Sequence, residues 1–232
     1  MPPPRSRKAS ARAVIQAGAG HRAFSAGADI PSLAARIAGG PERALREIMR
    51  RGHTPTRRIE EFAKPVIVAV NCLAYGGGCE IAEAAPLAIV AEHATFARPE
   101  IILGFPPPFG GSQRLPRHIG RRHGLEMILT GDLIPAARAA ELGLVNTVVS
   151  ADQLLDPGKE LVGRIIGHTP TAVAACLPID EGLAVEAACC AATVPTDGVR
   201  TGLRRLIERR PWLTEPTRSQ TRRRSHPEVT RN

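Results

Sequence analysis

The chain has 232 residues, of which 43% are hydrophobic and only 3% are aromatic. This size and composition fit one globular domain whose core is built from Ala, Val, Leu and Ile. No apolar run approaches the roughly 18 residues of a membrane-spanning helix. The basic N-terminus lacks the apolar stretch of a secretory signal, so we expect a cytoplasmic protein.

The formal net charge of +9 is concentrated at the two ends of the chain. Residues 1–12 carry four basic residues and no acidic one, and residues 214–232 carry five Arg and two Glu. Both ends are rich in Pro, Ser and Arg, a composition typical of disordered, solvated tails. We therefore predict two disordered tails and no specific nucleic-acid binding, while non-specific binding of polyanions by a tail stays open.

The first quarter of the chain shows strand and helix patterns. Residues 13–17 (AVIQA) predict a short strand. Residues 31–51 carry apolar side chains at helical spacing, interrupted at Gly39-Gly40-Pro41. Residues 52–55, with Gly and Pro at their ends, predict a loop.

Residues 65–91 predict a strand, a helix and a second strand in succession. The run PVIVAV at 65–70 is typical of a strand buried on both faces. Three glycines at 76–78 open a helix to about residue 85, and LAIVA at 87–91 predicts the next strand. A unit of this length favours a right-handed parallel crossover, so we predict an α/β fold.

The second half of the chain is mainly helical. After a rigid loop at 106–111, the pattern predicts helices at 112–129 and 135–142 and a strand at 145–149. From residue 151 onward the pattern is helical with proline interruptions. The five cysteines form no C-x-x-C pair and the histidines show no metal-ligand spacing, which indicates reduced thiols and no metal site.

Two stretches of small residues could bring the backbone close to another molecule. Residues 23–30 (AFSAGADI) form one of them. Residues 71–80 (NCLAYGGGCE) place three glycines where a strand gives way to a helix. Unpaired N–H groups and the helix dipole stabilise a phosphate or a developing oxyanion at such a junction, although three glycines also fit a tight turn.

Two glutamates near these stretches are candidate acid/base groups. Glu80 lies in the first turn of the predicted helix, and Glu100 follows Ala97-Arg98-Pro99. Taken alone, Glu80 also fits a carboxylate that complements the helix dipole, and Glu100 also fits a surface acid paired with Arg98.

Several motifs in order make the chain resemble the enoyl-CoA hydratase/isomerase (crotonase) superfamily, most closely enoyl-CoA hydratase. The matching sequences lie between residues 12 and 149: RAVIQAG, HRAFSAGADI, KPVIVAVNCLAYGGGCEIA, ATFARPEIILGFPPPFGGSQRLPRHIG and EMILTGDLIPAARAAELGLVNTVV. Residues 181–213 resemble the family's C-terminal helices. The resemblance implies a crotonase-like spiral of ββα/βαβ turns over 13–168 and a helical trimerisation region over 169–213.

The resemblance also implies chemical roles. The backbone N–H groups of Ala28 and Gly77 would form an oxyanion hole for a thioester carbonyl. Glu80 would hold and activate water, and Glu100 would deliver a proton. The coenzyme A (CoA) of the substrate would need no separate cofactor, and the protein would be a homotrimer or a dimer of trimers. Substrate-binding positions by this resemblance are Ser25, Ala26, Gly27, Asp29, Gly76, Pro108, Arg209 and Arg210.

Two alternatives remain open within this resemblance. Family isomerases need only a proton carrier near Glu100, so the presence of both glutamates favours a hydratase over an isomerase. The family's opening hairpin and helix have no counterpart before residue 12, which predicts an exposed sheet edge. Pro108 replaces a glycine whose N–H usually helps to hold a catalytic carboxylate and water. These departures favour the second alternative, a truncated and catalytically impaired scaffold.

Overall fold

The chain passes repeatedly between two sheets, adding a strand to each on successive turns. The computed structural model describes residues 11–177, 199–201, 203, 204 and 208. Arg209, Arg210, the 214–232 tail and most of the predicted 1–12 tail lie outside these residues. The strands are β1 (Val14–Ala17), β2 (Ala23–Ser25), β3 (Val66–Val70), β4 (Leu73–Tyr75), β5 (Leu87–Ala91), β6 (Thr95–Ala97), β7 (Ile134–Pro135) and β8 (Thr147–Val149).

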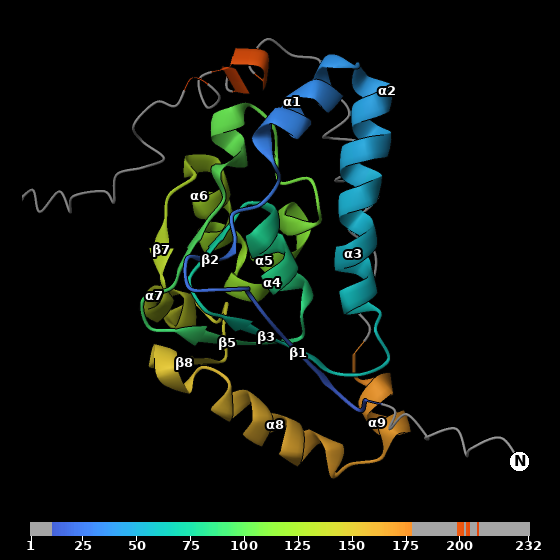
Figure 1. Cartoon of the computed structure of the whole chain (residues 1–232), viewed down its shortest axis with the longest axis vertical. Coiled ribbons are helices and arrows are strands. Elements are labelled where there is room, and N and C mark those ends of the chain that lie inside the picture. Colours follow the sequence, from blue (N-terminus) through green and yellow to red (C-terminus); the bar gives the residue numbers. More distant parts are fainter. Residues whose placement is uncertain (1–10, 178–198, 202, 205–207, 209–232) are drawn as a thin grey trace, which may run out of the picture.

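The helices lie around these sheets (Figure 1). They are α1 (Ile30–Ala38), α2 (Pro41–Ala44), α3 (Arg50–Glu60), α4 (Gly77–Ala84), α5 (Gly111–Ile119), α6 (Arg121–Thr130), α7 (Ala136–Glu141), α8 (Asp156–Ile166) and α9 (Pro170–Ala175). A π-helix, η1 (Leu45–Met49), joins α2 to α3, and two 3₁₀ turns are η2 (Pro99–Leu103) and η3 (Ala151–Gln153). Most of the predicted trimerisation region lies beyond the described residues.

The two sheets confirm the predicted α/β spiral. One has the order β1-β3-β5-β8 with every pair parallel. The other has the order β2-β4-β6-β7, in which only the β6–β7 pair is antiparallel. The predicted strand–helix–strand unit is β3, α4 and β5. Strands β2, β4, β6 and β7 were not predicted, because strands of two or three residues are too short to show a period. The three-residue β8 was predicted from the longer apolar pattern at 145–149.

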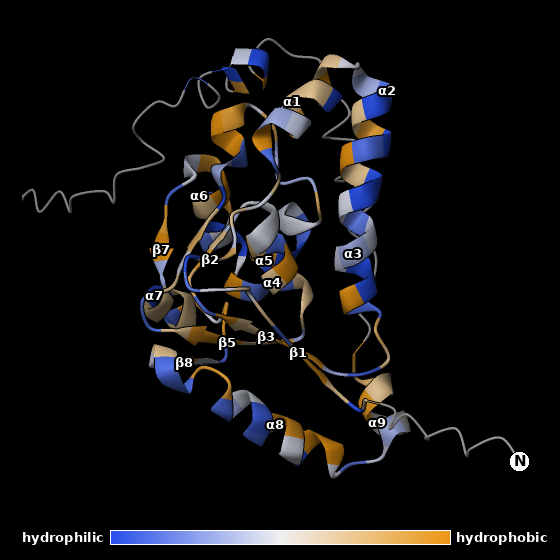
Figure 2. Ribbon diagram, in the orientation of Figure 1, coloured by the Kyte–Doolittle hydropathy of each residue, from blue (hydrophilic) through white to orange (hydrophobic). Residues whose placement is uncertain are grey.

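The central strand β3 is buried on both faces, as its β-branched run predicts. Val66, Val68 and Val70 face the larger core between the sheets. Ile67 and Ala69 face a second core that α8 covers through Leu161 and Val162. Figure 2 shows this contrast, with hydrophobic residues along the strands and mostly hydrophilic residues along α3.

The loop predicted at 52–55 is wrong, because α3 runs through it. A side chain at Gly52 would overlap the ring of Phe109, so this glycine allows the helix and the ring to pack together. Thr56 Oγ1 then donates to the Phe109 carbonyl at 2.8 Å. Tertiary packing thus overrides the weak helix propensity of Gly and Pro.

The single helix predicted at 112–129 is two helices. Gly120, with φ 78°, stands between α5 and α6. A left-handed φ suits glycine and ends α5. The predicted break at Gly39-Gly40-Pro41 is confirmed, since α1 ends at Ala38 and α2 begins at Pro41.

A buried ion pair attaches α3 to α5. Arg114 donates to both Glu60 oxygens, at 3.0 and 2.6 Å, and to the Phe109 carbonyl at 2.9 Å. We expect Arg114→Met to lower the free energy of unfolding by about 3–5 kcal/mol, because Glu60 would stay buried without its cation. Urea denaturation measures this loss.

Two further variants test that expectation. Arg114→Met combined with Glu60→Leu should recover most of the loss, since no charge stays buried. Arg138→Met breaks an exposed ion pair with Glu141 and should cost under about 1 kcal/mol. Equal losses from the buried and the exposed pair would contradict the account.

Candidate active site

The two stretches of small residues meet at one edge of a sheet. β2 and β4 are parallel neighbours, so the loops that leave their carboxyl ends lie side by side. Gly27 has φ 88°, and a Cβ on it would lie 3.0 Å from the Tyr75 carbonyl oxygen and 3.2 Å from the Gly77 nitrogen. A Cβ on Gly78 would overlap the Ser25 carbonyl. The glycines therefore allow direct contact of the two backbones.

This contact brings Gly27, the neighbour of Ala28, next to the Gly77 N–H at the start of α4. Within the described part of the chain, the N–H groups of Ala28 and Gly77 have no hydrogen-bond acceptor. Gly77 is the first residue of α4, where the helix dipole adds positive potential. Such a pair of donors can stabilise an oxygen that gains negative charge.

A cavity of about 260 Å³ opens at these donors, between α1, α3 and α4. Its polar walls include Arg36, Glu47 and Arg51, and its apolar walls include Leu33, Ile48 and Ile81. It is also lined by Ser25, Gly27, Ala28, Gly52, Pro55, Thr56, Gly77 and Phe109. A mainly apolar hollow with a few convergent polar groups is typical of a small-molecule site.

Glu80 is fully buried one turn into α4. Its Oε1 accepts hydrogen bonds from the Phe109 N–H at 2.8 Å and the Gly111 N–H at 2.9 Å. Donors of this kind favour the ionised carboxylate. Pro108 has no N–H to donate, so the N–H groups of Phe109 and Gly111 hold the Glu80 carboxylate instead. Neither donor was predicted from the sequence, because the path of the loop at 106–111 fixes their positions.

Glu100 lies in η2 and is 5% exposed, so its interpretation as a surface acid is wrong. Its Oε1 is 3.5 Å from Arg98 Nη1, so the pairing with Arg98 that this interpretation included is present, but in a buried setting. Among the described residues, neither Glu100 oxygen accepts a hydrogen bond of good geometry. Burial therefore raises the pKa of Glu100, and the charge of Arg98 opposes this shift.

Arg98 brings the two glutamates together. The guanidinium is fully buried, and its Nη1 lies 3.8 Å from Glu80 Oε1 as well as 3.5 Å from Glu100 Oε1. Its Nη2 forms an ion pair with Glu83, a residue that the sequence analysis did not single out. Glu83 follows Glu80 by three residues on α4, a spacing that puts both on one helix face and could have indicated it.

The remaining predicted binding residues have local partners. Asp29 caps α1 by accepting from the Ser32 N–H at 3.0 Å, and hydrogen bonds from Ser32 lower the pKa of Asp29. Ser25 Oγ accepts from the Gly27 N–H at 3.2 Å. The Gly76 carbonyl accepts from Arg98 Nη1 at 3.1 Å. Ala26 is exposed, and contact of these residues with CoA stays a prediction.

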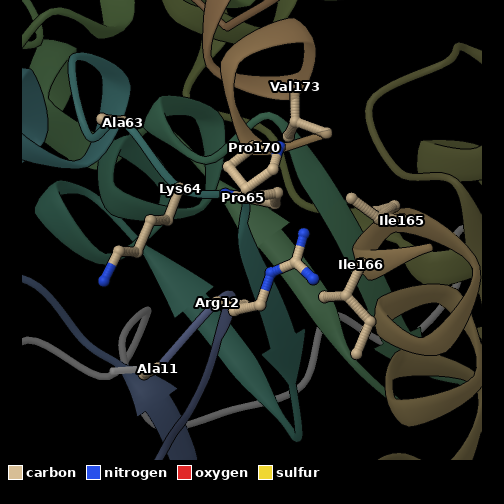
Figure 3. A pocket seen from close by; sticks show the side chains of 9 residues that line it. All are labelled: Ala11, Arg12, Ala63, Lys64, Pro65, Ile165, Ile166, Pro170 and Val173. Carbon is tan, nitrogen blue, oxygen red and sulfur yellow. The ribbon is translucent and has the colours of Figure 1, made fainter. Parts of the chain in front are cut away.

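A second hollow, of about 180 Å³, lies where β1 and β3 begin (Figure 3). Its walls come from the starts of these strands, from α8 and from α9, and Arg12 and Lys64 supply its charge. Arg12 is engaged, since its Nη2 donates to the His168 carbonyl at 2.9 Å. Ligands of parallel sheets bind at the carboxyl ends of the strands, so this hollow is not the candidate site.

Two mainly parallel sheets wound in a spiral, with two buried glutamates beside a glycine-rich helix start, define the class of crotonase-like α/β proteins. The sequence model of the enoyl-CoA hydratase/isomerase family matches residues 5–213, and the chain belongs to this family. No helix among the described residues is both long and apolar enough to span a membrane.

Two relatives of the chain are named as hydratases. The chain is 40% identical to a short-chain-enoyl-CoA hydratase of Clostridium acetobutylicum over 166 residues, which cover 69% of this chain and 60% of the relative. It is 37% identical to a crotonyl-CoA hydratase of Syntrophomonas wolfei, covering 85% of this chain and 78% of the relative.

A solved structure of an enoyl-CoA hydratase from Bacillus anthracis has the same fold. It aligns with a TM-score of 0.67 at 34% identity, over 87% of this chain and 80% of that one. The similarity therefore extends over most of both chains.

Proposed function

We propose that the protein is an enoyl-CoA hydratase that adds water reversibly, in the syn sense, to a trans-2-enoyl-CoA thioester. One observation carries this proposal. Glu80, held by two backbone donors, and Glu100, held by none, lie within ion-pair distance of the same Arg98 nitrogen. Hydration needs one carboxylate that accepts a proton and one carboxylic acid that donates one.

The thioester carbonyl would accept hydrogen bonds from Ala28 and Gly77. As water adds to C3, negative charge moves onto this oxygen, and fixed donors stabilise it without reorganisation. Glu80 takes a proton from the attacking water, and Glu100 gives its proton to C2. The product is a 3-hydroxyacyl-CoA. Water and the two carboxyl groups supply every proton, so the reaction needs no separate cofactor.

The rest of the substrate would lie across the loop at 25–29. Its exposed small residues leave the main chain open to the pantetheine and adenine groups. We propose that Arg209 and Arg210 meet the CoA phosphates and that the protein assembles as a homotrimer or a dimer of trimers. These proposals rest on the family resemblance.

Isomerisation of a 3-enoyl-CoA is the second candidate. It needs one proton carrier, and Glu100 has the raised pKa that suits such a carrier. Assays of Glu80→Gln with a 2-enoyl-CoA and a 3-enoyl-CoA separate the candidates. A hydratase loses its reaction with the 2-enoyl substrate. An isomerase keeps its reaction with the 3-enoyl substrate.

The ring of Phe109 should limit the acyl group that the site accepts. It lines the cavity and packs against Gly52 and Gly77, while its backbone N–H holds Glu80. Phe109→Ala keeps this N–H and enlarges the cavity. We expect the kcat/KM ratio of a longer enoyl-CoA to crotonyl-CoA to rise about tenfold or more.

A matched variant controls for the loss of a phenyl ring. Phe62 is 42% exposed and lies away from the cavity. Phe62→Ala should leave the ratio unchanged. A Phe109→Ala enzyme with the wild-type ratio would contradict the assignment of this ring to the acyl site.

A further inference from the structure

Four ionisable side chains share one buried cluster at the start of α4. Glu80 and Glu83 come from α4, and Arg98 and Glu100 from the junction of β6 and η2. The side chains of Glu80, Glu83 and Arg98 are 0% exposed, and that of Glu100 is 6% exposed. One cation therefore lies among three carboxyl groups. Burying three negative charges beside one positive charge is costly, so the cluster favours a bound proton.

The contacts of Glu83 identify it as the main counter-ion of Arg98. Glu83 forms the shortest ion pair of the guanidinium. Its Oε1 also accepts from the Cys79 thiol at 3.3 Å. Burial raises the pKa of the Cys79 thiol well above its usual range, so the thiol keeps its hydrogen for this bond. Glu83 therefore contacts both the Arg98 guanidinium and the Cys79 thiol.

Hydrogen bonding also distinguishes Glu80 from Glu100. Glu80 accepts two backbone hydrogen bonds, which stabilise its charge. In the described part of the chain, neither oxygen of Glu100 accepts a hydrogen bond of good geometry, and its nearest cation is Arg98 Nη1 at 3.5 Å. The proton of the cluster therefore belongs on Glu100, the group from which the proposed reaction takes it.

We propose that Arg98 and Glu83 are positioning residues of this site. Arg98 aligns the two reacting carboxyl groups, and Glu83 offsets enough of its charge for Glu100 to remain protonated. This inference rests on the proposed hydratase function. It adds two residues that touch no substrate and act through Glu80 and Glu100.

The neighbouring charged groups do not replace this pair. Arg114, from α5, is held by Glu60. His118, also from α5, has its Nε2 2.9 Å from the Glu83 carbonyl oxygen, on the backbone rather than the carboxylate. Among the described residues, Arg98 is thus the cation within ion-pair distance of Glu83 and Glu100.

The absence of a side chain at Gly111 leaves space for the Arg98 guanidinium beside the carboxyl groups. A Cβ on Gly111 would overlap Arg98 Nη2, while the N–H of Gly111 holds Glu80. The backbone that fixes one reacting carboxylate thus also leaves the space that Arg98 needs. The geometry of the cluster is built into the start of α5.

The pH dependence of hydration in Glu83→Gln tests the proposal. Without the Glu83 charge, Arg98 attracts the Glu100 carboxylate more strongly and lowers its pKa. Glu100 must be protonated to react, so activity is lost at a lower pH. We expect the alkaline limb of kcat/KM to shift about one pH unit downward, with KM at low pH unchanged.

Glu92→Gln is the matched control, because Glu92 is an exposed glutamate outside the cluster. It removes the same charge and should leave the profile in place. An unshifted profile in a folded Glu83→Gln enzyme would overturn the proposal, since a merely structural Glu83 would change stability alone.

A second measurement needs neither activity nor a folded variant of Glu83. Carbon-13 NMR of the wild-type protein, labelled at the glutamate carboxyl carbons, should show one carboxyl that stays protonated above pH 4.5, the ordinary glutamate value. Its signal should vanish in Glu100→Gln. A Glu100 that titrates at the ordinary value would overturn the inference. A wild-type protein that keeps this proton on Glu100 but does not hydrate an enoyl-CoA would refute the proposed function. The inference about the protonation of the cluster would still hold.

Discussion

Glu80→Gln and Glu100→Gln should each lower the rate of crotonyl-CoA hydration by about 10²- to 10⁴-fold. Glutamine at position 80 still accepts from the Phe109 and Gly111 N–H groups, but it cannot take a proton from water. Glutamine at position 100 has no acidic proton to deliver to C2. Loss of the enoyl-thioester absorbance measures both rates.

The fold of these variants should persist, because each substitution keeps the size of the side chain. Glu126→Gln, at an exposed position on α6, controls for the chemical change and should keep full activity. Circular dichroism and thermal unfolding report folding. Turnover at the wild-type rate in either active-site variant would refute the assigned acid/base roles.

Gly27→Ala should lower hydration by about 10²- to 10³-fold, the cost of losing one oxyanion donor. The added methyl would lie 3.2 Å from the Gly77 nitrogen and 3.0 Å from the Tyr75 carbonyl oxygen. It would therefore force apart the two loops that carry the paired N–H groups. The loss should appear in kcat more than in KM, since the oxyanion forms during the reaction.

Gly20→Ala separates this effect from backbone strain. Gly20 has φ 75°, close to the 88° of Gly27, but a Cβ there meets no atom within 4 Å. Both variants lose about 1–2 kcal/mol of stability through the left-handed conformation. Only Gly27→Ala should also lower the rate of hydration. Equal hydration rates in the two variants would show that Gly27 is needed only for its left-handed backbone conformation and does not align the oxyanion donors.

The sequence predicted the parts of the fold that repeat a regular pattern. The β-branched run of β3 and the apolar run of β5 indicated buried parallel strands, and the glycines before α4 indicated its start. These predictions succeeded because each depends on neighbouring residues. Gly52 and Pro55 misled the prediction of α3, since the packing of Phe109 against Gly52 decides that segment.

The site was predictable only in part, for a similar reason. The family motifs marked Glu80 and Glu100, and the structure brings both to Arg98. The Phe109 and Gly111 donors depend on the path of a loop, which residue types do not specify. Glu83 becomes significant only once η2 brings Arg98 against α4. The contact with Arg98 is long-range and carries no local signal, although the spacing of three residues places Glu83 on the same helix face as Glu80.

Hydration of crotonyl-CoA in heavy water by the purified wild-type protein tests the central claim most directly. The account predicts that the enoyl-thioester absorbance falls and that NMR finds 3-hydroxybutyryl-CoA with one deuterium at C2. An absorbance that stays constant while circular dichroism shows a folded chain would contradict it.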